Sequence, residues 1–325
     1  MKLGDLGERY LINYILDRAL AGQDMMLPKG DDAAAFWFNG LMVACVDMLV
    51  WETDVPPGMT WFQAGRKAVV AAVSDAASKG ARPKFLLVSL GLSPEMDFED
   101  FKQLVEGISQ AAEGYGAMVV GGDLNEQRSP SVSVAVMASA KSLMSRRGAR
   151  PGDLVAATGF FGKTYAGLHA SMHRLEASPS LLKAIHEPEA RVVEGVALAE
   201  SGGVSACIDS SDGLAESLYL LAEASGVGIV VDSLPVDGEA EAYCVEHGLS
   251  VYDAVFYGGE EYELVFTVKS GWEKVVEYCL KKLGRDFKPF GRVVSEPGVY
   301  YVDAGGRRLV ERRGWQHFNL FRKPV

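Results

Sequence analysis

Residues 60–92 read TWFQAGRKAVVAAVSDAASKGARPKFLLVSLGL, a stretch that changes from a helical pattern to a strand pattern within a few residues. Thr60 is a suitable N-cap for an Ala-rich helix that runs to Lys79. The apolar run Phe85–Leu92 then predicts a strand. Within the helix, Asp75 stands among small apolar residues, where an unpaired buried carboxylate would cost on the order of several kcal/mol. We therefore expect this acid to have a partner or a bound metal.

The alternation of helices and strands continues on both sides of this stretch. Before it, we expect a helix from Gly7 to Ala19 and strands at Ala33–Phe38 and Leu41–Val50. After it, we expect a helix that begins at Asp97 and ends at Gly114, and strands at Met118–Val120 and Ser131–Ala140. Together these elements predict a ββαβαββ sheet domain.

A polar segment rich in breaker residues, Arg146–Asp153, follows this domain and is the best candidate for a linker. A chain of 325 residues exceeds the size at which a single core stops growing. We therefore predict an N-terminal domain over residues 1–145 and a larger C-terminal domain over 146–325. The predicted fold class is α+β, with two mixed α/β domains. In the second, we expect strands at Leu154–Thr158, Ser205–Asp209, Gly228–Val231, Tyr262–Val268 and Gly298–Val302, and helices near Lys163–Leu175, Arg191–Ser201, Gly213–Ser225 and Trp272–Leu283.

Composition and charge exclude several classes of function. A net charge of -11 without a basic stripe disfavours nucleic acid as a partner. No apolar stretch is long enough to cross a membrane and no signal peptide is visible, so we expect a cytoplasmic protein without a membrane partner. The cysteines form no CxxC pair, which argues against zinc and predicts reduced thiols; they are Cys45, Cys207, Cys244 and Cys279.

Aspartates recur where predicted strands and helices end or are interrupted. They are Asp31, Asp32, Asp47, Asp75, Asp123, Asp209 and Asp212. Magnesium prefers oxygen ligands, usually with one or two carboxylates per ion and phosphate or water in the remaining positions. Bound Mg²⁺ also offsets the charge that builds during phosphoryl transfer. The pattern predicts a Mg²⁺-dependent enzyme that binds a nucleotide's phosphates and transfers a phosphoryl group without a covalent protein nucleophile.

Each aspartate also has a structural interpretation. Asp31, Asp32 and Asp123 are suited to turns, and Asp212 is suited to capping the helix that follows it. The stretch 158–163, TGFFGK, lacks the spacing of a P-loop, and the sequence contains no GxGxxG or HRD motif. P-loop and protein-kinase folds are therefore disfavoured.

Five motifs in register resemble the thiamine-monophosphate kinases, whose superfamily is that of aminoimidazole ribonucleotide synthetase. Their order and spacing match over nearly the whole chain. The motifs are GDDAA at 30–34, VSDAASKGA at 73–81, GGD at 121–123, DSSDGL at 209–214 and GGEEYEL at 258–264, with further support from Thr158-Gly159 and from GWQHF at 314–318.

The resemblance implies phosphorylation of thiamine monophosphate to thiamine diphosphate, with ATP as the co-substrate. It implies a homodimer joined through the N-terminal sheets. It also implies that the N-terminal domain binds ATP and Mg²⁺ and that the C-terminal domain completes the nucleotide and substrate site. The implied Mg²⁺ ligands are Asp31, Asp47, Asp75, Asp123, Asp209 and Asp212. The implied ATP contacts are Gly122, Asp123, Arg146 and Ser211, and the implied substrate contacts are Asp54, Glu260 and Trp315.

The sequence departs from the family pattern at several positions. Where the family often has Ser-Thr-Asp, this chain has Cys45–Asp47 (CVD), which removes hydroxyl ligands. Asp54 stands where many members carry a histidine that contacts the substrate, and Ser210 and Glu261 are milder changes. Two alternatives stay open: another ATP-dependent synthetase of the same superfamily, and a non-catalytic nucleotide-binding sensor.

Overall fold

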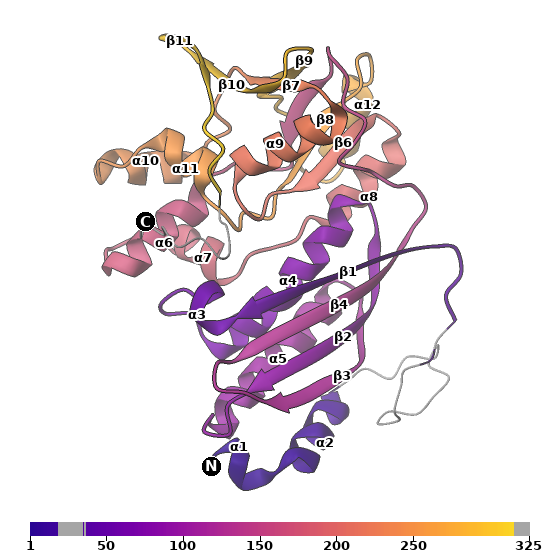
Figure 1. The fold of residues 1–325 in the computed structure, drawn as a ribbon, viewed down its shortest axis with the longest axis vertical. Coiled ribbons are helices and arrows are strands. Elements are labelled where there is room, and N and C mark those ends of the chain that lie inside the picture. Colours follow the sequence, from indigo (N-terminus) through magenta and orange to yellow (C-terminus); the bar gives the residue numbers. More distant parts are fainter. Residues whose placement is uncertain (19–34, 36, 315–325) are drawn as a thin grey trace. The chain divides into compact units, whose positions relative to one another are not determined.

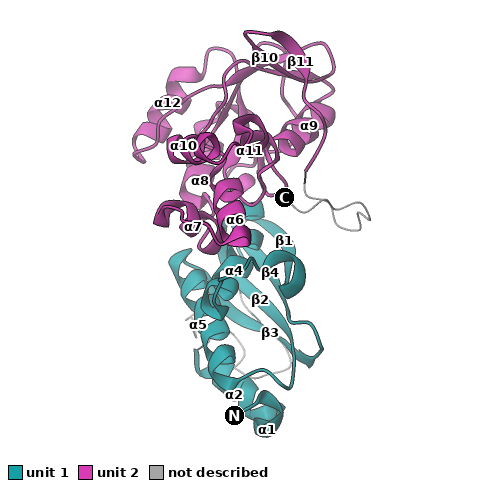
Figure 2. Cartoon of the chain, turned by 90° about the vertical axis from the view of Figure 1, so that its left-hand side faces the viewer, with its two compact units in different colours: residues 1–76, 81–141 teal, residues 77–80, 142–325 magenta. Residues whose placement is uncertain are grey.

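The chain folds into two compact units, seen in a computed structural model that describes residues 1–18, 35 and 37–314 (Figure 1). The first unit comprises Met1–Ala76 and Ala81–Lys141, and the second comprises Ala77–Gly80 and Ser142–Val325 (Figure 2). Each unit has its own β-sheet. None of the described helices is both long and apolar enough to cross a membrane.

The first unit is a four-stranded sheet with helices on one face. Its strands lie in the order β1-β4-β2-β3, with β2 and β3 parallel and the other pairs antiparallel. The helices α4 and α5 lie against one face (Figure 2). The elements are α1 (Leu3–Leu6), α2 (Glu8–Arg18), β1 (Leu41–Val50), α3 (Trp51–Asp54), α4 (Trp61–Ser78), β2 (Arg82–Leu92), α5 (Phe98–Gly114), β3 (Met118–Glu126) and β4 (Ser131–Ala140).

Thr60 caps the start of α4, as the sequence predicts, and Gln63 completes a capping box. The hydroxyl Oγ1 of Thr60 accepts a hydrogen bond from the backbone N–H of Gln63 at 3.2 Å, and the N–H of Thr60 donates to Oε1 of Gln63 at 3.0 Å. Small residues such as Ala68 and Ala72 are buried along the helix. They let α4 lie close to the sheet that it covers.

The two faces of this first sheet differ sharply in burial. Along β4, Val132, Val134 and Val136 are buried on the covered face, and the residues between them are more exposed. On the other face, β1 and β2 expose Met42, Val46, Met48 and Leu87. The register confirms that Val46 and Leu87 share this face, because both pair with Ala135. We call this apolar surface of β1 and β2 the open face.

The second unit is a seven-stranded mixed sheet in the order β11-β10-β7-β9-β5-β8-β6. Its strands are β5 (Leu154–Ala157), β6 (Val204–Asp209), β7 (Gly228–Val231), β8 (Leu264–Val268), β9 (Gly291–Val294), β10 (Gly298–Asp303) and β11 (Gly306–Leu309). Its helices are α6 (Lys163–His173), α7 (Pro179–His186), α8 (Val192–Ser201), α9 (Leu214–Ser225), α10 (Gly238–Glu246), α11 (Val251–Tyr257) and α12 (Glu273–Lys281).

Both faces of the central strands in this second sheet are buried. Along β8, Val265 packs into the core formed with α9 and α11, whereas Leu264 and Phe266 pack into a second core with α8 and α12. In β6, Ile208 and Cys207 divide between the same two cores. Strands covered on both sides are expected to be nearly continuously apolar, and β8, which reads LVFTV, fits that rule.

The predicted fold class, α+β with two mixed α/β domains, is confirmed. The strand expected at 33–38 lies mostly outside the described residues, and Ala35, Trp37 and Phe38 are not in a strand. The strand expected at Met118–Val120 was too short, because β3 continues to Glu126. Seven of the described elements were not predicted: α1, α3, α7, α10, α11, β9 and β11.

Candidate active site

Two loops of the second unit run side by side and carry four of the predicted site residues. One loop, Asp209–Gly213, begins with the last residue of β6, and the other, Gly258–Glu263, precedes β8. Three backbone hydrogen bonds join them. The N–H of Glu260 donates to the carbonyl of Ser211 at 2.6 Å, that of Tyr262 to the carbonyl of Ser210 at 2.9 Å, and that of Ser210 to the carbonyl of Glu263 at 2.9 Å. We call them the paired loops.

The paired loops bring together predicted ligands of metal, nucleotide and substrate. Asp209 is buried at the end of β6, Asp212 and Glu260 are half-buried, and Ser211 is exposed. The C-terminal segment also reaches this point, since a Cβ placed on Gly314 would lie 2.7 Å from the carbonyl oxygen of Asp212. Trp315, the next predicted residue, lies outside the described residues.

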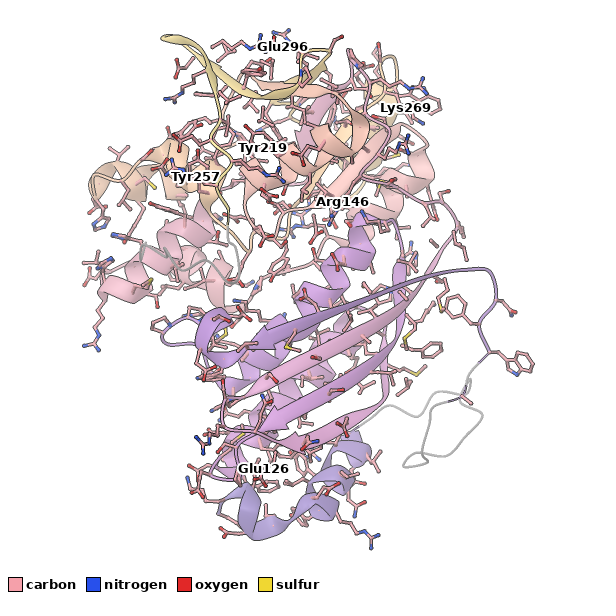
Figure 3. The ribbon with its side chains drawn as sticks, in the orientation of Figure 1. Glu126, Arg146, Tyr219, Tyr257, Lys269 and Glu296 are labelled. Carbon is pink, nitrogen blue, oxygen red and sulfur yellow. The ribbon has the colours of Figure 1, made fainter. Side chains whose placement is uncertain are left out.

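Arg146 lies on a segment that pairs with β6. The carbonyl of Ser145 accepts a hydrogen bond from the N–H of Cys207 at 2.8 Å, which fixes the backbone beside the strand two residues before Asp209. The side chain of Arg146, which is labelled in Figure 3, is exposed. An exposed guanidinium offers fork-shaped donors suited to a phosphate.

The second of the paired loops holds two strained residues. Glu260 has φ 63° and Tyr262 has φ 51°, and Arg174 is the only other non-glycine residue with positive φ among the described residues. Such a conformation costs roughly 1–3 kcal/mol per residue and persists only where surrounding contacts determine it. Strain of this kind gathers at functional sites.

A buried ion pair anchors this strained loop and was not predicted. The carboxylate of Glu263 accepts hydrogen bonds from Nε and Nη2 of Arg191 at 3.0 and 2.5 Å, and from Oγ1 of Thr158 at 2.5 Å. Burial alone would lower the pKa of Arg191, but the facing Glu263 holds that pKa above its usual value. The sequence signals were the motif GGEEYEL, which contains Glu263, and the pair Thr158-Gly159. A Cβ on Gly159 would lie 2.4 Å from the Glu263 carboxylate.

In the first unit, Asp47 and Asp75 flank one contact between β1 and α4. The thiol of Cys45 donates a hydrogen bond to the carbonyl of Ala72 at 3.2 Å. Asp47 lies two residues farther along the same face of β1, and Asp75 lies one helical turn beyond Ala72. Both carboxylates are half-buried on the covered side of the sheet.

Asp123 lies elsewhere in the first unit. Across the sheet, Asp123 of β3 pairs with Ser89 of β2, and Ser89 pairs with Ser133 of β4. Ser133 in turn pairs with Met48 of β1, so Asp123 and Met48 lie on the open face at opposite edges of the sheet. Asp47 points to the covered face, since it pairs with the buried Val134. Three strand spacings amount to about 14 Å. Within this unit, the fold therefore does not bring Asp123 together with Asp47. Asp123 also stands inside β3 with Gly122, rather than in a turn.

Asp54 anchors its own short helix. Its Oδ2 accepts a hydrogen bond from the N–H of Val50 at 2.7 Å, and its carbonyl accepts one from Nζ of Lys67 at 2.5 Å. Lys67 is only 2% exposed, so this ammonium is held against the Asp54 backbone in the interior. The position of Asp54 is thus fixed by the fold.

No group of three or more His, Cys, Asp or Glu side chains suited to a metal ion occurs within the described part of the chain. Asp31 and Asp32 lie outside that part. The aspartates that the structure describes are oxygen donors of the kind that Mg²⁺ prefers. The donor chemistry therefore fits magnesium, while each unit by itself holds only some of the predicted ligands.

Comparison with known protein families defines the class first. Residues 30–140 match the AIR synthase related protein N-terminal domain, and residues 150–303 match the AIR synthase related protein C-terminal domain. The hydrogenase maturation protein HypE of E. coli, at 21% identity and a TM-score of 0.78, covers 94% of this chain and 97% of its own. At that identity the likeness concerns the fold alone.

More similar relatives define the branch of this class. A thiamine-monophosphate kinase of Pyrococcus horikoshii is 35% identical over 89% of this chain and 90% of its own length. One of Aquifex aeolicus is 31% identical over 98% of this chain and 100% of its own. Among solved structures, the thiamine-monophosphate kinase of Stenotrophomonas maltophilia K279a has a TM-score of 0.79 at 27% identity, over 90% of this chain and 95% of that one.

A further structure, AaThiL complexed with AMPPCP and TMP, has a TM-score of 0.76 at 29% identity and covers 98% of this chain and 99% of its own. Identities of 35% and 31% over 89% and 98% of this chain extend through both units. The chain belongs to the thiamine-monophosphate kinases of the AIR synthase-related family.

Proposed function

We propose that this chain is an ATP-dependent kinase that phosphorylates thiamine monophosphate to thiamine diphosphate. The observation that carries the proposal is the pairing of the loops Asp209–Gly213 and Gly258–Glu263, which gathers acids, a hydroxyl and strained backbone in one place. The full-length similarity to thiamine-monophosphate kinases, one of them complexed with AMPPCP and TMP, supports the same activity.

Magnesium is the proposed metal. We propose that Asp31, Asp47, Asp75, Asp123, Asp209 and Asp212 hold several Mg²⁺ ions. When bound, these ions would offset the negative charge shared by donor and acceptor phosphates. The chain's own task is positioning: it holds two anionic groups in line for a direct transfer, which requires no covalent protein nucleophile.

The remaining site residues have distinct proposed tasks. Gly122, Asp123, Arg146 and Ser211 contact ATP, and Asp54, Glu260 and Trp315 contact thiamine monophosphate. Arg146 is suited to its task because its guanidinium is exposed and cannot lose its charge. Glu260 is suited to the cationic thiazolium because it offers a carboxylate on a loop whose position is fixed.

A homodimer joined through the N-terminal sheets completes the proposal. The open face of the first sheet exposes Met42, Val46, Met48 and Leu87, an apolar surface that a second copy would cover. Asp47 and Asp123 lie at opposite edges and on opposite faces of one sheet. We therefore propose that Asp123 of one copy joins Asp47 of the other. The cytoplasmic location stays a prediction.

The direct test is turnover by the purified full chain. With ATP and Mg²⁺, thiamine monophosphate should yield ADP and thiamine diphosphate in equal amounts, separated by chromatography. Parallel reactions contain thiamine or a ribonucleotide precursor of the purine pathway. Turnover with only the purine precursor would assign the chain to a sister synthetase. ATP binding by calorimetry without any turnover would favour the sensor.

A mixing experiment tests the dimer and its shared site together. Asp47→Asn and Asp123→Asn homodimers are each expected to be nearly inactive. After subunit exchange, half of the dimers are mixed, and each regains one site with both natural residues, so activity should recover to about a quarter of the unmodified level. If mixing restores nothing, while chromatography shows that exchange occurred, Asp47 and Asp123 do not share a site between copies.

A further inference from the structure

Glu261, in the second of the paired loops, closes the start of a helix far away in sequence. Its Oε1 accepts hydrogen bonds from the N–H of Gly162 at 2.7 Å, the N–H of Thr164 at 3.2 Å and Oγ1 of Thr164 at 3.0 Å. The N-cap of α6 is Gly162, which has no side chain to satisfy these N–H groups. Glu261 therefore supplies the cap that the helix itself lacks.

Glu261 lies between two strained residues, so its hydrogen bonds to α6 also hold the strained loop. Glu260 before it and Tyr262 after it both have positive φ. Backbone in this conformation persists only where surrounding contacts hold it, so the loop needs such contacts. Glu263 holds the end of the loop through Arg191. Glu261 holds the middle, directly beside Glu260.

The carboxylate of Glu261 occupies this place against an electrostatic penalty. Burial raises the pKa of Glu261 to about 7, although the hydrogen bonds from Thr164 and Gly162 act in the opposite direction, and the charge of Glu263 raises it further. Acids held in costly environments beside a strained loop are typical of functional sites. Capping alone would be served equally well by a small serine or aspartate at the N-cap.

We propose that Glu261 is a positioning residue for the thiamine-monophosphate end of the site. It ties the strained loop to the N-terminus of α6 and thereby fixes where Glu260 presents its carboxylate. This inference rests on the proposed function, because Glu260 is the proposed substrate contact. Glu261 itself faces the helix, since its Oε1 is used by Gly162 and Thr164.

The first arm of the test measures steady-state kinetics with each substrate varied separately. Glu261→Ala removes the acceptor, and we expect KM for thiamine monophosphate to rise about tenfold or more, the equivalent of losing roughly one buried hydrogen-bonded contact. KM for ATP should stay within about twofold. Glu261→Gln keeps an acceptor oxygen and should restore KM to within about threefold of the unmodified value.

Two further variants separate positioning from general stability. Ser178→Ala removes the N-cap of α7, where Oγ accepts from the N–H of Leu181 at 3.3 Å. It should lower the melting temperature by a few degrees, with KM unchanged. Thr164→Val removes one donor to Glu261 and keeps the backbone N–H, so it serves if Glu261→Ala fails to fold. It should raise KM for thiamine monophosphate in the same direction by less.

The second arm needs no activity. Hydrogen exchange in the ligand-free protein should be faster over 258–264 in Glu261→Ala than in the unmodified protein or in Glu261→Gln. Unchanged exchange there, or equal rises in both KM values, would overturn the positioning role. An unmodified chain that does not phosphorylate thiamine monophosphate would instead overturn the proposed function, and the exchange result would still decide whether Glu261 holds the loop.

Discussion

The two β-sheets of the molecule differ in how many of their faces are covered. In the second unit, alternate residues of β8 enter two separate cores, so the central sheet is covered on both sides. In the first unit, α4 and α5 cover one face, and Val46 and Met48 remain exposed on the other. A sheet with an uncovered apolar face is suited to association with another chain. In a unit whose sheet is covered on both faces, polar side chains such as Glu261 and Ser210 lie in the interior, where their burial changes the free energy of unfolding. Four predictions test this contrast.

The largest effect on activity is expected from replacing Asp123, an acid on the open face of the first sheet. Asp123→Asn should lower kcat by about a hundredfold or more at saturating Mg²⁺, since it removes a proposed metal ligand and leaves the strand intact. A matched control is Asp303→Asn, an exposed acid at the end of β10 in the second sheet, which should leave kcat unchanged. Near-normal activity of Asp123→Asn, with an unaltered melting temperature, would remove this residue from the metal site.

The next effect concerns association. Val46→Asp places a charge on the open face, where the side chain is 66% exposed in the single chain. Burying that charge at a dimer interface would cost on the order of several kcal/mol, so sedimentation should show monomers. Val245 on α10 is 70% exposed in the second unit, and Val245→Asp should leave the oligomeric state unchanged. If both variants sediment alike, the open face is not an interface.

A smaller effect concerns the pH dependence of stability in the second unit. The pKa of Glu261 is about 7 in the folded protein, against 4.5 for an unperturbed side chain. As pH rises from about 4.5 to 7, the unfolded chain gives up this proton before the folded chain, so the contribution of Glu261 to stability falls. Glu261→Gln does not titrate. We expect chemical denaturation to show that the free energy of unfolding of Glu261→Gln, relative to that of the unmodified protein, is higher at pH 8 than at pH 5. The same difference in free energy at both pH values would contradict the raised pKa.

The smallest effect is a gain in stability. Ser210 is fully buried in the paired loops, and its Oγ has no hydrogen-bond partner among the described residues. Ser210→Ala should therefore raise the free energy of unfolding by about 1 kcal/mol. Ser217 is a buried serine whose Oγ donates to the carbonyl of Gly213 at 3.1 Å, and Ser217→Ala should lose about as much. A loss in both variants would mean that Ser210 has a partner in solution.

Much of the fold follows from local sequence patterns, because long elements repeat their signal. The 17 residues of α5 bury Phe101, Leu104, Val105 and Ile108 at helical spacing, and the run Leu41–Val50 forms β1 as predicted. The short helices α7, α10 and α11 have too few turns for a period to show. Their caps, Ser178, Asp237 and Ser250, were the signals available for them.

The prediction ended β3 too early, before a pair of glycines. The predicted strand Met118–Val120 stops before Gly121-Gly122, yet both glycines lie within β3. A Cβ on Gly122 would lie 1.7 Å from the carbonyl oxygen of Val88, so the glycine serves a close approach between neighbouring strands. A pair of glycines by itself does not distinguish such an approach from a turn.

The sequence predicted which residues belong to the candidate site, but it did not predict how they are arranged in space. Asp209 and Glu260 belong to motifs that stand out in the sequence, but only the backbone bonds between their loops bring them together. Equally, nothing in the spacing of Asp47 and Asp123 reveals that their strands occupy opposite edges of one sheet. Long-range pairing sets both relations, and a single sequence does not encode it locally.

The methionines of the open face carry a consequence for damage by oxidants. Met42 and Met48 are exposed in the isolated chain, and conversion of a thioether to a sulfoxide would turn an apolar contact into a polar one. In the proposed homodimer a second copy would shield these sulfur atoms, so newly made chains would be more vulnerable before they associate. Peroxide treatment should therefore modify Met42 and Met48 faster in a dilute, dissociated sample than in a concentrated one. The extent of their oxidation would then report how long the chain remains monomeric.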